Sequence, residues 1–299
     1  MINQFLHRKA LPLDRDAHRA LHARMPVTDW RVASRLNSLF VAAAEFGDVC
    51  REYPIVFLHA GKDAAGQLQI APVAVFGLSA EENLFLDGAA WRAHYMPALL
   101  RLYPFAIGRI DDKSFAICVD MDWDGLSQTE GTAMFDEQGQ PTALTQSAQQ
   151  QLEQIEAEIQ RTRLVGQRLL ELDLLQEMRF DVTMPDGSNV AVEGFYTVNE
   201  EKLKALSDAT VLDLQRNGLL GLVHAHLISL GNMRRLATDV RLWLGVLVIA
   251  GSAYFYDYWT VLQQASEIAE LDSALLGSDL PIDAFLDKGF ENWLKRSGQ

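Results

Sequence analysis

The densest group of chemically versatile side chains in this sequence lies between residues 83 and 105. Tyrosine and tryptophan combine a large apolar ring with a polar edge, and arginine both stacks on rings and binds carboxylates through two N–H groups. Apolar walls with a few converging polar groups are what a pocket for a small molecule or peptide requires. We predict a ligand-binding site from this group, completed by an acid and an imidazole from later in the chain: Asn83, Phe85, Trp91, Tyr95, Arg101, Tyr103, Phe105, Asp120 and His226.

Arg101 has two interpretations in this set. It could anchor an anionic group of the ligand, or it could be a structural arginine buried against a carboxylate such as Asp120. The four-residue spacing of Trp91 and Tyr95 would place both rings on one face if the segment is helical. The sequence leaves the pocket and the packed core as open alternatives.

His224 and His226 form a His-x-His pair. On a strand both rings would share a face and could hold a metal, whereas on a helix they would point about 200° apart. No carboxylate lies close in sequence to complete a triad of two histidines and one acid, so Asp120 or Asp122 could do so only through the fold. We therefore expect a hydrogen-bonded His226 in the core, and we predict neither a metal nor another cofactor.

Recognised catalytic motifs are missing from the sequence, so the catalytic residues stay unknown. There is no Gly-x-Ser-x-Gly, no phosphate-binding Walker loop and no His-Glu-x-x-His.

The net charge of −14 over 299 residues comes without a basic stripe, which argues against a nucleic-acid partner. Cys50 and Cys118 are expected as buried thiols. The first residues lack the apolar run of a signal peptide, which predicts a cytoplasmic body or export by a route that reads no N-terminal signal.

The elements that must position these residues follow from periodicity and turn chemistry. Residues 1–35 are polar and predict an extended arm. Helices are expected at 38–52, 89–100, 147–177, after Asn199, and at 208–216. Strand pairs are expected at 55–58 with 72–78, at 105–110 with 114–120, and at 179–184 with 190–198. Hairpins and helices in this order predict an α+β fold, in which antiparallel hairpins pack with one long amphipathic helix and several short helices.

Several blocks of the sequence, in order, resemble the SapC family of bacterial proteins. They include Glu45-Phe46, Tyr53-Pro54-Ile55-Val56-Phe57, Glu82-Asn83-Leu84-Phe85, Tyr95-Met96-Pro97, Tyr103-Pro104-Phe105, Gly194-Phe195-Tyr196 and Ala225-His226-Leu227. The family tends to Asp where this chain has Asn199. The resemblance covers roughly residues 5–238. It implies a connection with the bacterial surface layer, because the family is named after a gene beside a surface-layer gene, and it implies no reaction.

The C-terminal residues lie outside this resemblance, so we divide the chain into a SapC-like domain at 1–240 and an extension at 241–299. Residues 242–256 are apolar or aromatic apart from Ser252, and the stretch continues to residue 262 with Asp257 as its only charge. A membrane-spanning helix needs about 20 apolar residues. The extension is therefore a membrane anchor, which would associate the protein with the inner membrane, a buried core helix, or a helical tail that supports homo-oligomers.

Three functions are compatible with these features. The first is an accessory binding protein of the SapC type for a small molecule, a peptide or a partner in the cell envelope. The second is an enzyme that modifies a peptide or sugar, with Asp120, Asp122 or His226 as acid or base. The third is a structural protein associated with the surface layer, which predicts a strong self-association surface.

Overall fold

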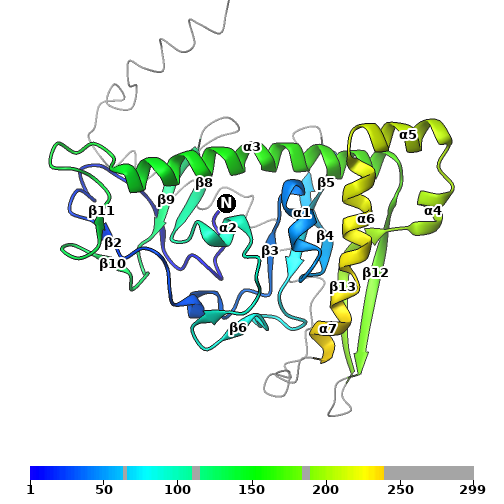
Figure 1. Cartoon of the computed structure of the whole chain (residues 1–299), viewed down its shortest axis with the longest axis horizontal. Helices are drawn as coiled ribbons and strands as arrows, with labels where there is room; N and C mark the ends of the chain where they lie inside the picture. The colour runs from blue at the N-terminus through cyan, green and yellow to red at the C-terminus, as the bar shows by residue number, and fades with distance from the viewer. Residues whose placement is uncertain (63–65, 110–114, 184–188, 239–299) are drawn as a thin grey trace, which may run out of the picture. The chain divides into compact units, whose positions relative to one another are not determined.

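The structure is a computed structural model, and it describes residues 1–62, 66–109, 115–183 and 189–238. The chain divides into two units, Met1–Thr260 and Val261–Gln299, and every described residue belongs to the first. The predicted boundary after residue 240 and the apolar stretch 242–262 lie outside the described residues. Antiparallel strands combine with several helices, one of them long, which confirms the α+β prediction (Figure 1).

The largest sheet has five strands in the order β12-β13-β4-β5-β3. The predicted apolar runs at 55–58 and 72–78 form its central hairpin, β4 (Ile55–Lys62) and β5 (Leu68–Val75). The predicted strand pair at 179–184 with 190–198 forms β12 (Leu175–Thr183) and β13 (Asn189–Val198). Tyr196 of β13 pairs with Phe57 of β4. The short strand β3 (Ser38–Phe40) pairs with the other edge of β5.

A second sheet has the order β1-β9-β8, from β1 (Ala10–Pro12), β9 (Phe115–Asp120) and β8 (Phe105–Arg109). This sheet contains the predicted strand pair at 105–110 with 114–120. Short strands form two further sheets: β10 (Leu126–Ser127), β2 (His22–Ala23) and β11 (Thr132–Ala133) in one, β6 (Leu86–Asp87) and β7 (Ala90–Trp91) in the other. Residues 1–35 are thus not a free arm, because they supply β1 and β2 and bury Leu6 and Leu21.

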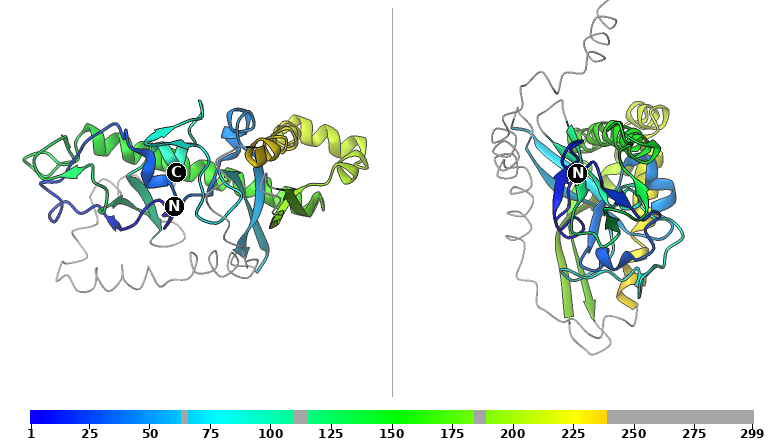
Figure 2. Two further views of the ribbon diagram at one scale, coloured as in Figure 1. Left: turned by 90° about the horizontal axis from the view of Figure 1, so that it is seen from below. Right: turned by 90° about the vertical axis from the view of Figure 1, so that its left-hand side faces the viewer.

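The long helix α3 (Ala143–Glu171) contacts β5 of the large sheet and β8 of the second sheet. The end-on view in Figure 2 (right) shows this helix along one side of the strands. Gly166 allows the close approach, since a Cβ at that position would lie 2.9 Å from both the carbonyl oxygen and Cγ1 of Ile70. Helix and sheets therefore share one apolar core, which includes Leu152, Ile159 and Leu169 of α3.

Within residues 199–238, four helices follow β13. Asn199 begins α4 (Glu200–Lys204), where its side chain accepts a hydrogen bond from the Lys202 N–H, and Ser207 begins α5 (Asp208–Arg216) in the same way. Gly218, with φ +81°, provides the left-handed turn into α6 (Leu219–Ser229), and α7 (Asn232–Thr238) follows directly. The predicted N-cap at Asn199 and the predicted helix at 208–216 are both confirmed.

Two predicted helices are wrong. The helix expected at 38–52 divides into β3, a short 3₁₀ turn (Ala43–Glu45) and one turn of helix α1 (Phe46–Val49), because the unpaired edge of β5 recruits residues 38–40. The helix expected at 89–100 is β7 followed by α2 (Ala98–Arg101), which begins only after Pro97; a proline disfavours helical dihedrals in the residue before it. The long helix begins four residues earlier and ends six residues earlier than expected, because β12 takes the residues from Leu175.

Candidate functional site

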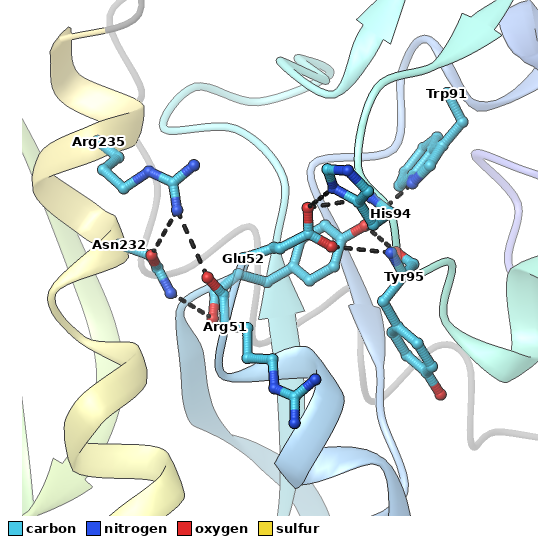
Figure 3. Close-up of polar contacts among 8 residues, drawn as sticks. Arg51, Glu52, Trp91, His94, Tyr95, Asn232 and Arg235 are labelled. Atoms are coloured by element: carbon cyan, nitrogen blue, oxygen red, sulfur yellow. Dashed lines mark hydrogen bonds and ion pairs between the residues drawn. The ribbon is translucent and has the colours of Figure 1, made fainter.

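The predicted aromatic group is organised around Tyr53, a fully buried residue between α1 and β4. The indole Nε1–H of Trp91 donates to the Tyr53 hydroxyl at 3.0 Å, and that hydroxyl donates to the carbonyl oxygen of Tyr95 (Figure 3). The rings of Phe85 and Phe76 lie 4.5 Å and 5.4 Å from the Tyr53 ring. Burial raises the pKa of Tyr53, so its hydroxyl stays protonated as a donor. We call these five residues the Tyr53 cluster.

Glu52 fixes the backbone next to this cluster. Its carboxylate accepts the backbone N–H groups of Tyr95 at 2.8 Å and His94 at 3.0 Å, and His94 Nδ1 lies 3.2 Å away (Figure 3). Partial burial would raise the pKa of the Glu52 carboxyl, but these donors outweigh burial and hold the pKa below its usual value. Glu52 therefore stays ionised and orients the segment that carries Trp91 and Tyr95.

A second carboxylate, Glu45, holds the side chain of Tyr95. It is buried and accepts from the Tyr95 hydroxyl at 2.9 Å and from the backbone N–H groups of Ala98 and Ala42 at 2.7 Å and 2.9 Å. Burial and the charge of Glu45 both raise the pKa of Tyr95. The guanidinium of Arg101 lies 5.5 Å from the centre of the Tyr95 ring. Arg101 itself is exposed, so the interpretation of it as an arginine buried against Asp120 is wrong.

Phe105 and Asp120 lie in the sheet β1-β9-β8, and Tyr103 lies between α2 and β8. All three are buried. The Tyr103 hydroxyl donates to one Asp120 carboxylate oxygen at 2.9 Å, and the backbone N–H of Lys9 donates to the other at 2.8 Å. Asp120 is thus fully engaged in joining the N-terminal residues to β9. Asn83 is also engaged, because its side chain donates to the Ala33 carbonyl oxygen and accepts from the Phe85 N–H.

His226 is inserted between two strands of the large sheet. Given the Tyr196–Phe57 pair, continued antiparallel pairing would place Val198 opposite Ile55. Instead the Val198 N–H donates to His226 Nε2 at 3.1 Å, and His226 Nδ1 lies 2.8 Å from the Ile55 carbonyl oxygen. Both ring nitrogens are therefore occupied, as expected for a core histidine. Burial lowers the pKa of His226 to about 4, so the ring is neutral at pH 7.

Helices α6 and α7 also hold the backbone that carries Glu52 and Tyr53. The Asn232 side chain donates to the carbonyl oxygens of Cys50 at 2.9 Å and Tyr53 at 3.3 Å. The Ser229 hydroxyl accepts from the N–H of Ile55 at 2.9 Å. Reasoning from the sequence missed the roles of four residues, because most of their hydrogen-bond partners are distant in sequence: Glu45, Glu52, Tyr53 and Asn232. Two of the four, Glu45 and Tyr53, stand in blocks that resemble the SapC family, and that was the signal that could have indicated them.

The side chains of the site that reach the surface are mainly cationic. Arg101 stacks on Tyr95, and Arg51, whose side chain is 76% exposed, lies 3.6 Å from Asp48. The two other carboxylates, Glu45 and Glu52, point inward to the hydrogen-bond donors described above. Cys50 is only partly buried, contrary to the prediction, whereas Cys118 is buried as expected. Two guanidinium groups, of Arg101 and Arg51, are thus exposed here, and the Asp48 carboxylate is exposed beside Arg51.

Comparison with known families agrees with the sequence blocks. A SapC family model matches residues 13–236, most of the chain. The chain belongs to the SapC family. A second family model, a protein of unknown function (DUF3619), matches residues 197–296 of this SapC-family protein and overlaps the first from the end of β13 to α7. No curated protein and no solved structure matches this chain significantly.

Within the described part of the chain, no three His, Cys, Asp or Glu residues come together in a way that could hold a metal ion. His224 and His226 lie on helix α6, where the first is exposed and the second is buried, so the arrangement on a strand that would let them share a metal does not occur. Among the same described residues, no helix has the length and apolar character needed to cross a bilayer.

Proposed function

We propose that this SapC-family protein is an accessory binding protein whose ligand, a small molecule or peptide, places an anionic group on Arg101 beside Tyr95. The observation that carries the proposal is the rigid support of this pair. The Tyr95 hydroxyl is bound to Glu45, its backbone is bound to Glu52 and Tyr53, and the Arg101 guanidinium lies 5.5 Å from the centre of its ring. A preorganised aromatic surface beside an exposed guanidinium binds with little loss of side-chain entropy.

Binding is a better explanation of the site than turnover. An enzyme would use Asp120, Asp122 or His226 as acid or base. Asp120 and His226 are buried with their polar atoms already hydrogen-bonded, and Asp122 is exposed outside the Tyr53 cluster as defined above. The hydroxyls of Tyr53 and Tyr95 have raised pKa values, which suits hydrogen-bond donors and opposes their use as bases at neutral pH. These contacts support a ligand-binding role over the peptide- or sugar-modifying alternative.

The test uses the Trp91 indole, which reports directly on the Tyr53 cluster. We would titrate ¹⁵N-labelled full-length protein with short aromatic peptides that end in a free carboxylate, and with the same peptides ending in an amide. The carboxylate form should shift the Trp91 indole resonance, and Arg101→Ala should weaken its binding about 10- to 100-fold, the value of a charge-assisted hydrogen bond. Arg161→Ala, at an exposed arginine of α3, is the matched control.

Equal binding of the amide and carboxylate peptides, or unchanged affinity in Arg101→Ala, would refute the anion-binding proposal.

We further propose that the natural ligand or partner belongs to the cell envelope, on the strength of family membership. Fractionation of cells with detergent and carbonate, comparing the full chain with one cut after Val240, tests this; recovery of both only in the soluble fraction, without any envelope protein, contradicts it. Strong self-association without ligand binding would instead favour a structural surface-layer protein.

A further inference from the structure

Helix α7 binds the backbone of the turn before β4 through two side chains. The buried amide of Asn232 donates to the carbonyl oxygens of Cys50 and Tyr53. The guanidinium of Arg235 donates to the carbonyl oxygen of Arg51 at 3.5 Å and to the side-chain oxygen of Asn232 at 3.1 Å (Figure 3). Three carbonyl oxygens of one turn are thus held by one short helix.

The same turn also supports the proposed ligand site. Its Glu52 carboxylate accepts the backbone N–H of Tyr95 at 2.8 Å. Its Tyr53 hydroxyl donates to the Tyr95 carbonyl oxygen and accepts from the indole N–H of Trp91. The Arg101 guanidinium lies over the ring of the same Tyr95. Hydrogen bonds therefore connect α7, through the turn, to the residue that Arg101 contacts.

Helix α7 is too short to persist away from the sheet. Isolated helices of fewer than about 12 residues are marginal in water, and α7 has seven. Its buried side chains, Met233 and Leu236, belong to one apolar cluster with Val56 and Leu58 of β4. An element held by so few side chains is of the kind that opens locally while the rest of a fold stays intact. Docked and detached are thus two discrete states of α7.

We propose that the docking of α7 controls the ligand affinity of the site at Arg101 and Tyr95, with Asn232 as the positioning residue. The inference rests on the proposed function of that site. With α7 docked, the turn is fixed and Tyr95 is held in its binding position. With α7 detached, the turn carbonyl groups lose their donors, and a ligand has to order the turn as it binds, which lowers its affinity. The linkage is reciprocal, so a bound ligand strengthens the docking of α7 by the same factor.

Binding and hydrogen exchange on the full-length protein test this coupling. Asn232→Ala should weaken binding of the aromatic peptides that end in a free carboxylate by about 2- to 30-fold, the range for substitutions along a coupling network. Without ligand, the same variant should speed exchange of the Tyr95 amide by a similar factor. Gly166→Ala is the matched control, because it disturbs the packing of α3 on Ile70 and should leave the peptide affinity of the folded protein unchanged.

The reciprocal measurement needs no substitution. Saturating carboxylate peptide should slow the exchange of the α7 amides in the wild type, and it decides the question if Asn232→Ala does not fold. Unchanged α7 exchange on binding would overturn the coupling.

A purely structural Asn232 makes a different prediction, namely lower stability with unchanged peptide affinity, and that result would also overturn the proposal. If Arg101→Ala weakens binding but Asn232→Ala does not, the coupling fails and the proposed function stands. If the wild type binds neither peptide, the proposed function fails, and the control of affinity by α7 fails with it. In that case exchange of the Tyr95 amide in Asn232→Ala still shows whether α7 positions this residue.

Discussion

Replacing the imidazole of His226 should change how the stability of the protein depends on pH. In the unfolded chain this histidine binds a proton below about pH 6.5, whereas burial lowers its folded-state pKa to about 4. Protonation would also remove the lone pair with which Nε2 accepts the Val198 N–H. The stability that the neutral ring supplies is therefore fully present above pH 6.5 and is lost as the pH falls towards 4.

The magnitude follows from this pKa difference. The shift of about 2.5 units corresponds to about 3 kcal/mol in total, and the part lost between pH 7.5 and pH 5 is about 2 kcal/mol. No charged side chain contributes to the shift, which arises from burial and is opposed only by the hydrogen bond to the Ile55 carbonyl oxygen. The pH dependence should therefore belong to His226 itself and persist at high salt.

The assay is urea unfolding of the full chain at pH 7.5 and pH 5. We compare the wild type with His226→Gln, whose amide can donate and accept but does not titrate, and with His224→Gln, an exposed neighbour on α6. The wild type and His224→Gln should lose about 2 kcal/mol more than His226→Gln between the two pH values. Equal losses in all three proteins would refute the reasoning. If His226→Gln does not fold, an NMR titration that places the His226 pKa near 6.5 would do the same.

Three further changes test the packing around the site. Gly166→Ala should destabilise the protein by about 1–3 kcal/mol in chemical denaturation, because the new methyl group would overlap Ile70; an unchanged stability would contradict the close approach of α3. Tyr53→Phe should cost about 1–3 kcal/mol and speed the solvent exchange of the Trp91 indole proton, which loses its acceptor. Asn232→Ala should cost a similar amount, because two carbonyl oxygens before β4 lose their donor, and slower or equal exchange in that turn would argue against this role.

Local chemistry explains why the hairpins could be predicted from the sequence. The runs at Ile55–Lys62 and Leu68–Val75, and the strands on either side of residues 184–188, combine β-branched alternation with a turn sequence, and both partners lie within a few residues of each other. The cap at Asn199 is equally local, since its acceptor and donor are three residues apart. Family membership was also readable, because several ordered blocks had to agree.

The candidate site was predicted in part. Trp91, Tyr95 and Arg101 do lie near one another, but the helix expected to align the first two is absent, and Tyr53 and two glutamates align them instead. Tyr103, Phe105 and Asp120 share the aromatic and acidic character of the site, yet Tyr103 and Asp120 are hydrogen-bonded to each other and Phe105 pairs with Val119 between β8 and β9. Residue type alone could not separate the two groups, because burial depends on which strands pair.

What the sequence determined by itself was therefore the set of elements whose partners are near in the chain: the hairpins, the caps and the α+β class. The tertiary structure decided the contacts across long sequence separations. Ser38–Phe40 became a strand because β5 had an unpaired edge, and His226 took over a strand-to-strand hydrogen bond 171 residues from Ile55. Such contacts depend on packing and on satisfying buried backbone groups, and neither is encoded in a short window of sequence.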